Sequence, residues 1–544
     1  MIKKAMILAG CILLLFSAFA QQLGIDNDQG WGTGRIAILV VGLALAGSGF
    51  LATRYPEQYS KVVDTVWKRW YLILAVVPVV LTYLWVSQIN IEYTRQHYQY
   101  YAELARSFKN GRLHLEQKPS PALLALENPY DYDLRVQAAV EDFPWDVSLY
   151  KEKFYLYYGP VPALLLSVFS EGFLSQIGDR HLVITFALGL FLYEILILLR
   201  FFARSTPQPP GWLAGIAILT LGLTAPTAIM LQESRLYQAA VFGCQFFLIG
   251  GCYWVYSAIT DIRPTLWKLG LAGVHWGLAL GTRSAILPVL LYAAVIAMIG
   301  IYFVFRLTLA EMLLPFFAAA IPLLFAAASL AWYNQARFDS IFEFGLKYTL
   351  TNMNYLTGND IFSARHMGVN FYNYFLHPFR LSPHFPYLFR IEYIFSSERL
   401  AGLFYIAPYI FFALLPLAPQ RKAALADGMP YSRSLAASSP EFWLLVMCAG
   451  SAVIGAITVH LFWTTEMRYI EDFMPSLLLF ANANVALGYN ALENHVRQRQ
   501  MFVLVTVLFA AITVVAGTLV ALKSDSLLIW TNLGDTILRI LNIK

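Results

Sequence analysis

Carboxylates and aromatic residues alternate in the polar stretch of residues 90–159. Asp142 and Asp146 lie among aromatic side chains shortly before the run Tyr155–Pro160, which reads YLYYGP. A carboxylate that is packed with aromatic groups at a membrane surface loses solvation, which raises its pKa and lets it serve as a general base. For any single acid, the alternative is a solvated loop residue that is balanced by nearby lysines and arginines.

Two arginines in short charged segments are candidate anion ligands. Arg468 and Tyr469 lie beside three acids in the segment 464–475, and Arg235 follows Glu233 between two apolar runs. A guanidinium binds phosphate oxygens through charge-assisted hydrogen bonds, so we expect Arg468 to act as a phosphate clamp. Arg235 fits a phosphate or a carboxylate, and a local pair with Glu233 is the alternative.

A second polar stretch, residues 334–399, combines aromatic side chains with Lys347, Arg365 and His366. This composition suits a site that stacks on sugar rings and holds an anionic group, or else a belt that anchors the loop in the membrane interface. The spacing of His366, His377 and His384 matches no usual ligand pattern, and we predict no metal site.

The rest of the sequence is mostly apolar. Of its 544 residues, 58% are hydrophobic and 13% are charged, whereas a soluble domain has about 25% charged residues. The formal net charge of +5 is scattered in short clusters and predicts no nucleic-acid binding. We predict an all-α polytopic transmembrane helix bundle of about 13 spans. The apolar runs are 5–20, 35–52, 71–89, 182–202, 212–231, 237–257, 266–281, 284–306, 310–333, 400–417, 441–463, 472–490 and 501–522.

The basic residues of the short loops set the orientation, because cytoplasmic loops are enriched in lysine and arginine. All the basic clusters after residue 160 fall inside only if the run 160–177, which contains prolines and Glu171, is re-entrant or interfacial and does not cross the membrane. The segments are then N-terminal spans 1–89, a first outer loop 90–159, a membrane core 160–333, a second outer loop 334–399 and C-terminal spans 400–544. Shorter outer loops are expected at 232–236, 282–283 and 464–471.

Two segments near the membrane surface have alternatives. Tyr98, Tyr101, Ala105 and Phe108 recur at helical spacing and predict an amphipathic helix in the headgroup layer of the first outer loop. Residues 1–20 fit an uncleaved first span or a cleaved signal peptide.

Taken in order, these segments resemble the GT-C-type membrane glycosyltransferases, the superfamily of protein O-mannosyltransferases and aminoarabinose transferases, as an uncharacterised bacterial branch. The resemblance covers residues 90–480 and rests on Trp145-Asp146, the run Tyr155–Leu164, the stretch Tyr333–Tyr348 and the segment Arg468–Pro475. It implies a GT-C-like architecture, a polyprenyl-phosphate sugar as donor, and an outer-loop carboxylate as base.

The resemblance has one departure, at the position where the family usually carries an Asp-Gly. The matching stretch here begins at Glu92 and contains no aspartate, so the base is Asp146, with Glu92 or Asp142 as substitutes, or catalysis has been lost. The implied phosphate ligands are Arg468 and Arg235, with Lys347 assisting.

The implied function is transfer of a sugar to an acceptor hydroxyl on the outer face of the bacterial inner membrane, with the large loops on the periplasmic or extracellular side. The acceptor is an envelope glycan, lipid or protein, and membrane lipid surrounds the chain. No cofactor is certain, and a divalent cation at the phosphate stays open. The alternatives are a transporter or lipid flippase, for which Glu194 and Glu311 are candidate intramembrane acids near span ends, and a non-catalytic scaffold for envelope assembly.

Overall fold

The computed structural model describes residues 2–19, 33–55, 70–89, 99–140, 142–356, 360–392, 399–415 and 437–522. The chain forms two compact units, residues 1–74 with 523–544, and residues 75–522. In the first unit, α1 (Ile2–Phe19) packs against α2 (Thr33–Arg54). Helix α4 (Trp70–Val86) contributes its residues from Ala75 onward to the second unit.

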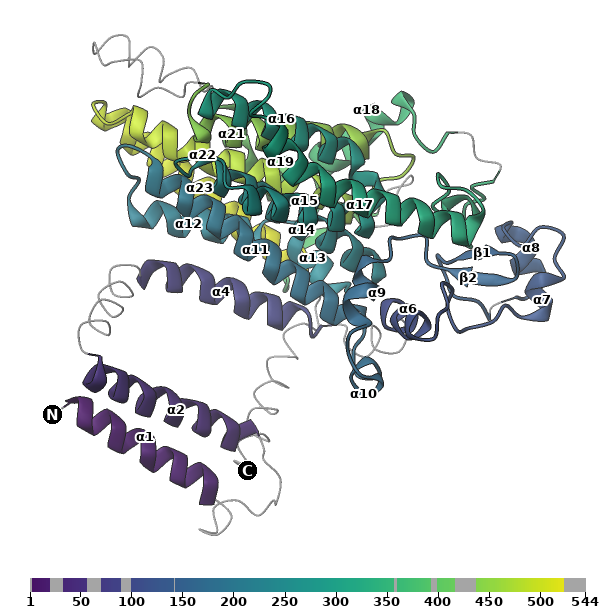
Figure 1. Ribbon diagram of the computed structural model, residues 1–544, viewed down its shortest axis with the longest axis horizontal. Coiled ribbons are helices and arrows are strands. Elements are labelled where there is room, and N and C mark those ends of the chain that lie inside the picture. The colour runs from purple at the N-terminus through teal and green to yellow at the C-terminus, as the bar shows by residue number, and fades with distance from the viewer. Residues whose placement is uncertain are drawn as a thin grey trace. The chain divides into compact units, whose positions relative to one another are not determined.

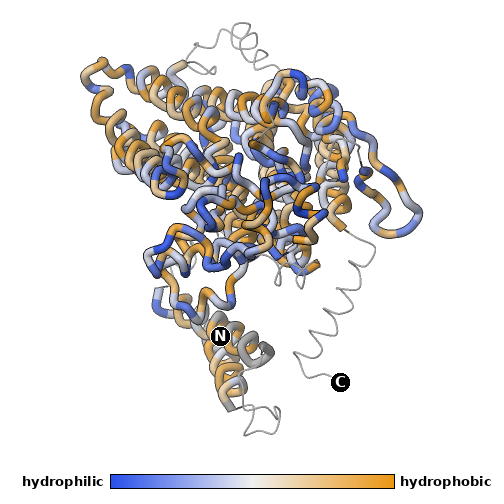
Figure 2. The backbone as a smooth tube through the Cα atoms, turned by 90° about the vertical axis from the view of Figure 1, so that its right-hand side faces the viewer, coloured by the Kyte–Doolittle hydropathy of each residue, from blue (hydrophilic) through white to orange (hydrophobic). Residues whose placement is uncertain are grey.

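The second unit is a bundle of apolar helices (Figure 1). Within the described residues, six segments are long and apolar enough to cross a membrane, and hydrophobic residues predominate along them (Figure 2). The predicted all-α polytopic bundle is therefore confirmed. The six are α11 (Asp179–Arg204), α14 (Leu236–Ile259), Ser284–Phe305 with η1 (Ser284–Ile286) and α16 (Leu287–Phe305), α17 (Leu313–Phe338), α21 (Pro440–His460) and α23 (Val496–Leu519).

Helix α14 is the most buried of the six, because it is apolar on all sides. It packs between α11 and α15 (Leu266–Thr282), and α15 packs in turn against α17. Small residues allow this close approach. A Cβ atom at Gly251 would collide with the indole of Trp276, and one at Gly273 would collide with the carbonyl oxygen of Ala319.

Prolines interrupt two of the predicted spans. The run 212–231 forms α12 (Gly211–Leu223) and α13 (Thr227–Gln232), separated at Pro226. The run 400–417 is not one helix either: it forms α19 (Leu403–Ile406) and the 3₁₀ helix η5 (Pro408–Leu414). Because Pro408 forces the preceding residue out of helical geometry, the prediction of a single span there is wrong.

The first polar stretch folds into short elements at one end of the bundle (Figure 1). The predicted amphipathic helix is present as α6 (Tyr100–Lys109), and its apolar face, which includes Tyr101 and Ala105, is buried against α9 (Val161–Leu166) and α10 (Glu171–Leu174). Since α9 and α10 have six and four residues, neither can cross a bilayer as a helix. The other elements of the first polar stretch are α7 (Pro121–Leu124), α8 (Tyr132–Gln137), β1 (Ser148–Tyr150) and β2 (Lys153–Tyr155), and α9 and α10 follow in the run 160–177.

The second polar stretch begins later than predicted, because α17 continues to Phe338. Residues Tyr372–Leu376 form a π-helical turn, and two short strands pair antiparallel, with Phe379 opposite Arg390. The elements are η2 (Leu346–Tyr348), η3 (Ala364–His366), α18 (Met367–Phe371), η4 (Tyr372–Leu376), β3 (Phe379–Leu381) and β4 (Leu388–Arg390).

The five segments predicted to share the outer face meet at one end of the bundle. The two long stretches pair through backbone hydrogen bonds, in which the Leu350 N–H donates to the Val147 oxygen and the Asp146 N–H donates to the Leu350 oxygen, both at 3.0 Å. The three shorter segments join them through other contacts: Arg390 with Glu233, Gly159 with Thr282, and Asn373 with Thr465.

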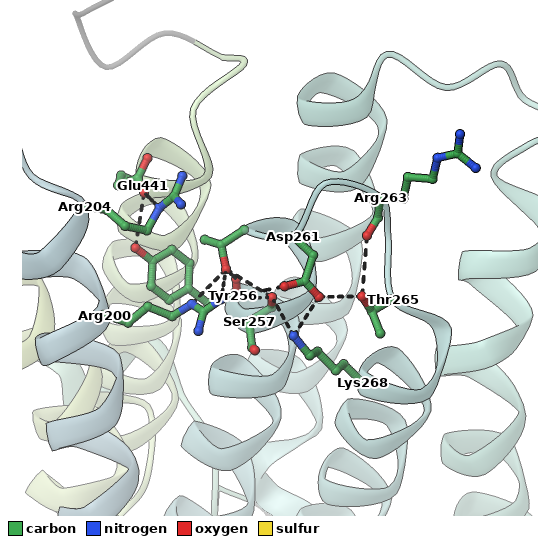
Figure 3. Close-up of polar contacts among 10 residues, drawn as sticks. Arg200, Arg204, Tyr256, Ser257, Asp261, Arg263, Thr265, Lys268 and Glu441 are labelled. Carbon is green, nitrogen blue, oxygen red and sulfur yellow. Dashed lines mark hydrogen bonds and ion pairs between the residues drawn. The ribbon is translucent and has the colours of Figure 1, made fainter. Parts of the chain in front are cut away.

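Basic residues predicted to lie inside gather at the other end of α11 and α14 (Figure 3). Lys268 lies 2.6 Å from Asp261, and Arg200 lies 3.9 Å from the same carboxylate. Arg204 pairs with Glu441 at the start of α21. The two ends of the bundle thus carry the two sets of loops that the charge pattern separated.

Candidate functional site

Asp146 lies in the turn just before β1, where the second polar stretch holds its backbone. Its φ of 57° is in the left-handed region, which aspartate tolerates better than most residues. The backbone pairing with Leu350 keeps this turn in place. The side chain of Asp146 is half-buried, whereas that of Asp142 is exposed.

The carboxylate of Asp146 is oriented by a tyrosine from a membrane helix. The hydroxyl of Tyr237, the second residue of α14, donates a hydrogen bond to Oδ2 of Asp146. Tyr237 is buried, so its ring is fixed by the surrounding helices. Because this bond is made to Oδ2, Oδ1 of Asp146 can accept a proton, as the carboxylate of a general base must.

Arg468 lies on the same tyrosine. Its guanidinium is 4.5 Å from the centre of the Tyr237 ring and 5.2 Å from that of Tyr469, and it pairs with Glu466. Its side chain is only 13% exposed, so its charge acts in a poorly solvated environment where electrostatic interactions are strong. The structure therefore brings the predicted base and the predicted phosphate ligand to one residue, Tyr237.

A second arginine completes this cluster. Arg283, next to the end of α15, pairs with Asp472 and lies 5.6 Å from the centre of the Tyr469 ring. The Tyr469 ring thus contacts two guanidiniums. Burial raises the pKa of Tyr158, and the charges of Arg468 and Arg283 oppose that increase.

The YLYYGP run owes its position to a close backbone contact. The N–H of Gly159 donates to the carbonyl oxygen of Thr282 at 3.1 Å, and a Cβ atom at Gly159 would collide with the carbonyl oxygen of Gly281. Only glycine allows the chain to pass the end of α15 this closely. This contact places Tyr158 6.0 Å from Tyr237, ring centre to ring centre.

The other predicted site residues have different surroundings. Lys347 pairs with Glu343 at 2.8 Å, close in sequence to Leu350. Arg365 pairs with Asp360, and the ring of His366 bonds to the Asp360 carbonyl oxygen at 2.8 Å, so these two face their own loop. Three predicted residues remain: Arg235, which is the N-cap of α14; Asp142, which is exposed; and Glu92, which lies outside the described residues.

Sequence reasoning missed Tyr237 and Asp472 as site residues and left Arg283 open between an anion ligand and a local ion pair. Arg283 stands alone between two apolar runs, and a charge in that position needs a partner. That signal could have paired Arg283 with one of the acids of the segment 464–475. Tyr237 carries no such signal, because a tyrosine at a membrane boundary is most often an interface anchor.

The two candidate intramembrane acids, Glu311 and Glu194, lie in different surroundings. Glu311 lies in the turn before α17, where it accepts hydrogen bonds from Thr308. Glu194 is 3% exposed and lies in the interior of α11, so it is an acid within a membrane helix and not near the end of one. Across the described part of the chain, no group of three His, Cys, Asp or Glu side chains is placed to hold a metal ion.

Comparisons with known proteins add little. No family model and no curated protein matches the chain. Among solved structures, it is similar to ArnT from Cupriavidus metallidurans bound to undecaprenyl phosphate, with 13% identity over 86% of this chain and 79% of ArnT, and a TM-score of 0.35. So distant a likeness carries no argument about function, which rests on the residues of this chain.

Proposed function

We propose that the chain is an integral membrane glycosyltransferase of GT-C-like architecture that moves a sugar from a polyprenyl-phosphate donor to an acceptor hydroxyl. The observation that carries the proposal is the convergence on Tyr237 of a carboxylate, Asp146, and a poorly solvated guanidinium, Arg468. The two groups are far apart in sequence and match the two needs of the reaction, a base and an anion ligand.

Asp146 removes the proton from the acceptor hydroxyl as that oxygen attacks the anomeric carbon of the sugar. The bond to Tyr237 holds the carboxylate in place, and such positioning lowers the barrier by fixing the reacting groups beforehand. A single displacement inverts the anomeric centre. Glu92 and Asp142 are the alternative bases.

Arg468 neutralises the polyprenyl phosphate as it leaves. Positive charge aimed at a developing anion in a poorly solvated site contributes strongly to catalysis. Arg235 assists from the start of α14, two residues before Tyr237, and Lys347 assists from the segment that pairs with the Asp146 turn. Phosphate binding would compete with Glu466 for Arg468.

The reaction takes place at the end of the bundle where the predicted outer loops meet, and we assign that end to the periplasmic or extracellular side of the bacterial inner membrane. The lipid tail of the donor would lie among the membrane lipids, and the acceptor, an envelope glycan, lipid or protein, would approach from the exposed loops.

Radiolabel transfer from a panel of polyprenyl-phosphate sugars tests this function in membranes that carry the protein. We expect transfer by the wild type, a loss of at least about 100-fold in Asp146→Asn, and a loss of about 100- to 1,000-fold in Arg468→Ala. Asp133→Asn is the matched control, since this carboxylate is exposed in the same loop. Unchanged transfer by Asp146→Asn would move the base to Glu92 or Asp142, and no transfer by the wild type would refute the enzyme.

One observation favours a second candidate, a transporter or lipid flippase. Ionisable residues deep within membrane helices mark transport pathways, and Glu194 is such a residue. This function predicts lipid or solute movement across proteoliposomes that Glu194→Gln abolishes, without any sugar transfer.

A further inference from the structure

A cavity of the second unit is lined by residues other than Asp146, Tyr237, Arg468 and Arg283, which form the Asp146 cluster. Its lining is apolar except for four oxygen-bearing side chains, Tyr83, Glu194, Thr227 and Glu471. The four come from four different elements: α4, α11, α13 and the 3₁₀ helix η7 (Met467–Asp472). Neither glutamate has a part in the proposed transfer reaction.

The two carboxyl groups lack the solvent that normally stabilises them. Glu194 and Glu471 are each 3% exposed, as is Tyr83, and Thr227 is 7% exposed. Oε2 of Glu471 is buried without a hydrogen-bond partner among the described residues. A buried carboxylate oxygen without a partner is costly, so an unmade interaction at this position points to a ligand that supplies it.

We propose that Glu194 and Glu471 bind a hard divalent cation, of the Mg²⁺ and Ca²⁺ class, in this cavity. Two carboxylates balance a double positive charge. Their four oxygens, with the hydroxyls of Tyr83 and Thr227, give an all-oxygen ligand set of the kind these ions prefer. No histidine or cysteine lines the cavity, which argues against the softer metals.

The cation joins four elements that are distant in the sequence. Of these, η7 also carries Arg468 and Tyr469, whose side chains belong to the Asp146 cluster. A bound ion therefore fixes η7 at Glu471, three residues after Arg468. Binding to the folded state alone also stabilises the protein, because it shifts the folding equilibrium by mass action.

Mn²⁺ titration of the purified, chelator-treated full chain in detergent, read by electron paramagnetic resonance, tests the site without reference to sugar transfer. We expect about one Mn²⁺ per chain, displaced by Mg²⁺ or Ca²⁺, and a rise in Tm with each ion. Glu194→Gln and Glu471→Gln should each weaken binding at least tenfold. Glu493→Gln, which changes an exposed carboxylate elsewhere, should leave it unchanged.

Two milder variants keep the test decisive if a glutamine variant does not fold. Thr227→Val and Tyr83→Phe each remove one hydroxyl with almost no change of shape, and each should weaken Mn²⁺ binding several-fold. Absence of Mn²⁺ binding by the wild type would overturn the proposal. Binding that all four variants retain at wild-type strength would overturn it as well.

Discussion

At the scale of single residues, the site depends on one side chain that joins two predicted groups. Asp146 and Arg468 could be chosen from the sequence, because a carboxylate among aromatics and an arginine beside acids each indicate chemistry. Their meeting on Tyr237 could not be predicted, since it depends on how α14 is placed against two loops. The hydroxyl and the ring of Tyr237 have separate tasks, which makes them separable by mutation.

Replacing Tyr237 by phenylalanine removes the hydroxyl that holds Asp146 and keeps the ring under Arg468. We therefore expect kcat for sugar transfer to fall about tenfold or more, with KM for the donor little changed, because the bond orients the base and does not bind the donor. Tyr237→Leu also removes the ring and should raise KM in addition. Steady-state kinetics on both variants separates the two roles, and equal kinetics for the two would contradict this division.

Glu471 should make stability depend on pH. Burial, with a smaller contribution from Asp472, raises the pKa of Glu471 to about 8, against about 4.3 in an unfolded chain. The folded state therefore keeps a proton that the unfolded state releases. Its contribution to stability is complete below the unfolded pKa and is lost as pH rises toward 8, at a slope that approaches about 1.4 kcal/mol per pH unit.

The measurement is Tm between pH 5 and 8 in the presence of a chelator. The wild type should lose stability across this range, and Glu471→Gln should lose less, because its neutral amide has no proton to release. Glu493→Gln serves as the control and should follow the wild type. A Glu471→Gln variant as pH-dependent as the wild type would assign the slope to other groups.

At the scale of elements, the sequence predicts helices well and their interruptions poorly. The hydrophobic runs predict the spanning helices because a membrane helix needs about 20 apolar residues and little else. The run 400–417 was wrongly predicted to be a single span, because Pro408 breaks the helix without lowering the hydropathy of the run. The pairing of the two outer loops, Val147 with Leu350, is also absent from the sequence pattern, since it depends on backbone groups that every residue has.

Helix α15 offers a test of close packing with a control one turn away. Gly273→Ala places a Cβ against the Ala319 carbonyl oxygen of α17, so we expect a loss of about 1–3 kcal/mol. At Gly270 a Cβ would lie 3.7 Å from the Ala318 oxygen, an ordinary contact. Gly270→Ala should leave Tm unchanged or raise it, because alanine favours the helix. Thermal unfolding in detergent compares the two, and equal effects would refute the packing argument.

At the scale of the whole molecule, the side of the membrane on which each later loop lies depends on whether residues 160–177 cross it. The charge pattern requires that residues 160–177 do not cross the membrane, and this stretch folds as α9 and α10, which are too short to span. The loops around Asp146 and the cluster of Arg200 and Lys268 thus lie at opposite ends of α14.

Cysteine labelling in spheroplasts tests this sidedness directly. Of the four cysteines, three are buried and Cys11 is exposed, so a Cys11→Ala variant has no exposed native cysteine that the label could modify. In that background a membrane-impermeant maleimide should label Asp142→Cys and Gln176→Cys, both exposed, without permeabilisation. Ile262→Cys, at a position 97% exposed at the other end, should react only after permeabilisation. If Gln176→Cys reacted only from the inner side, residues 160–177 would cross the membrane. Every later basic cluster would then be outside, and Arg468 could not share a face with Asp146.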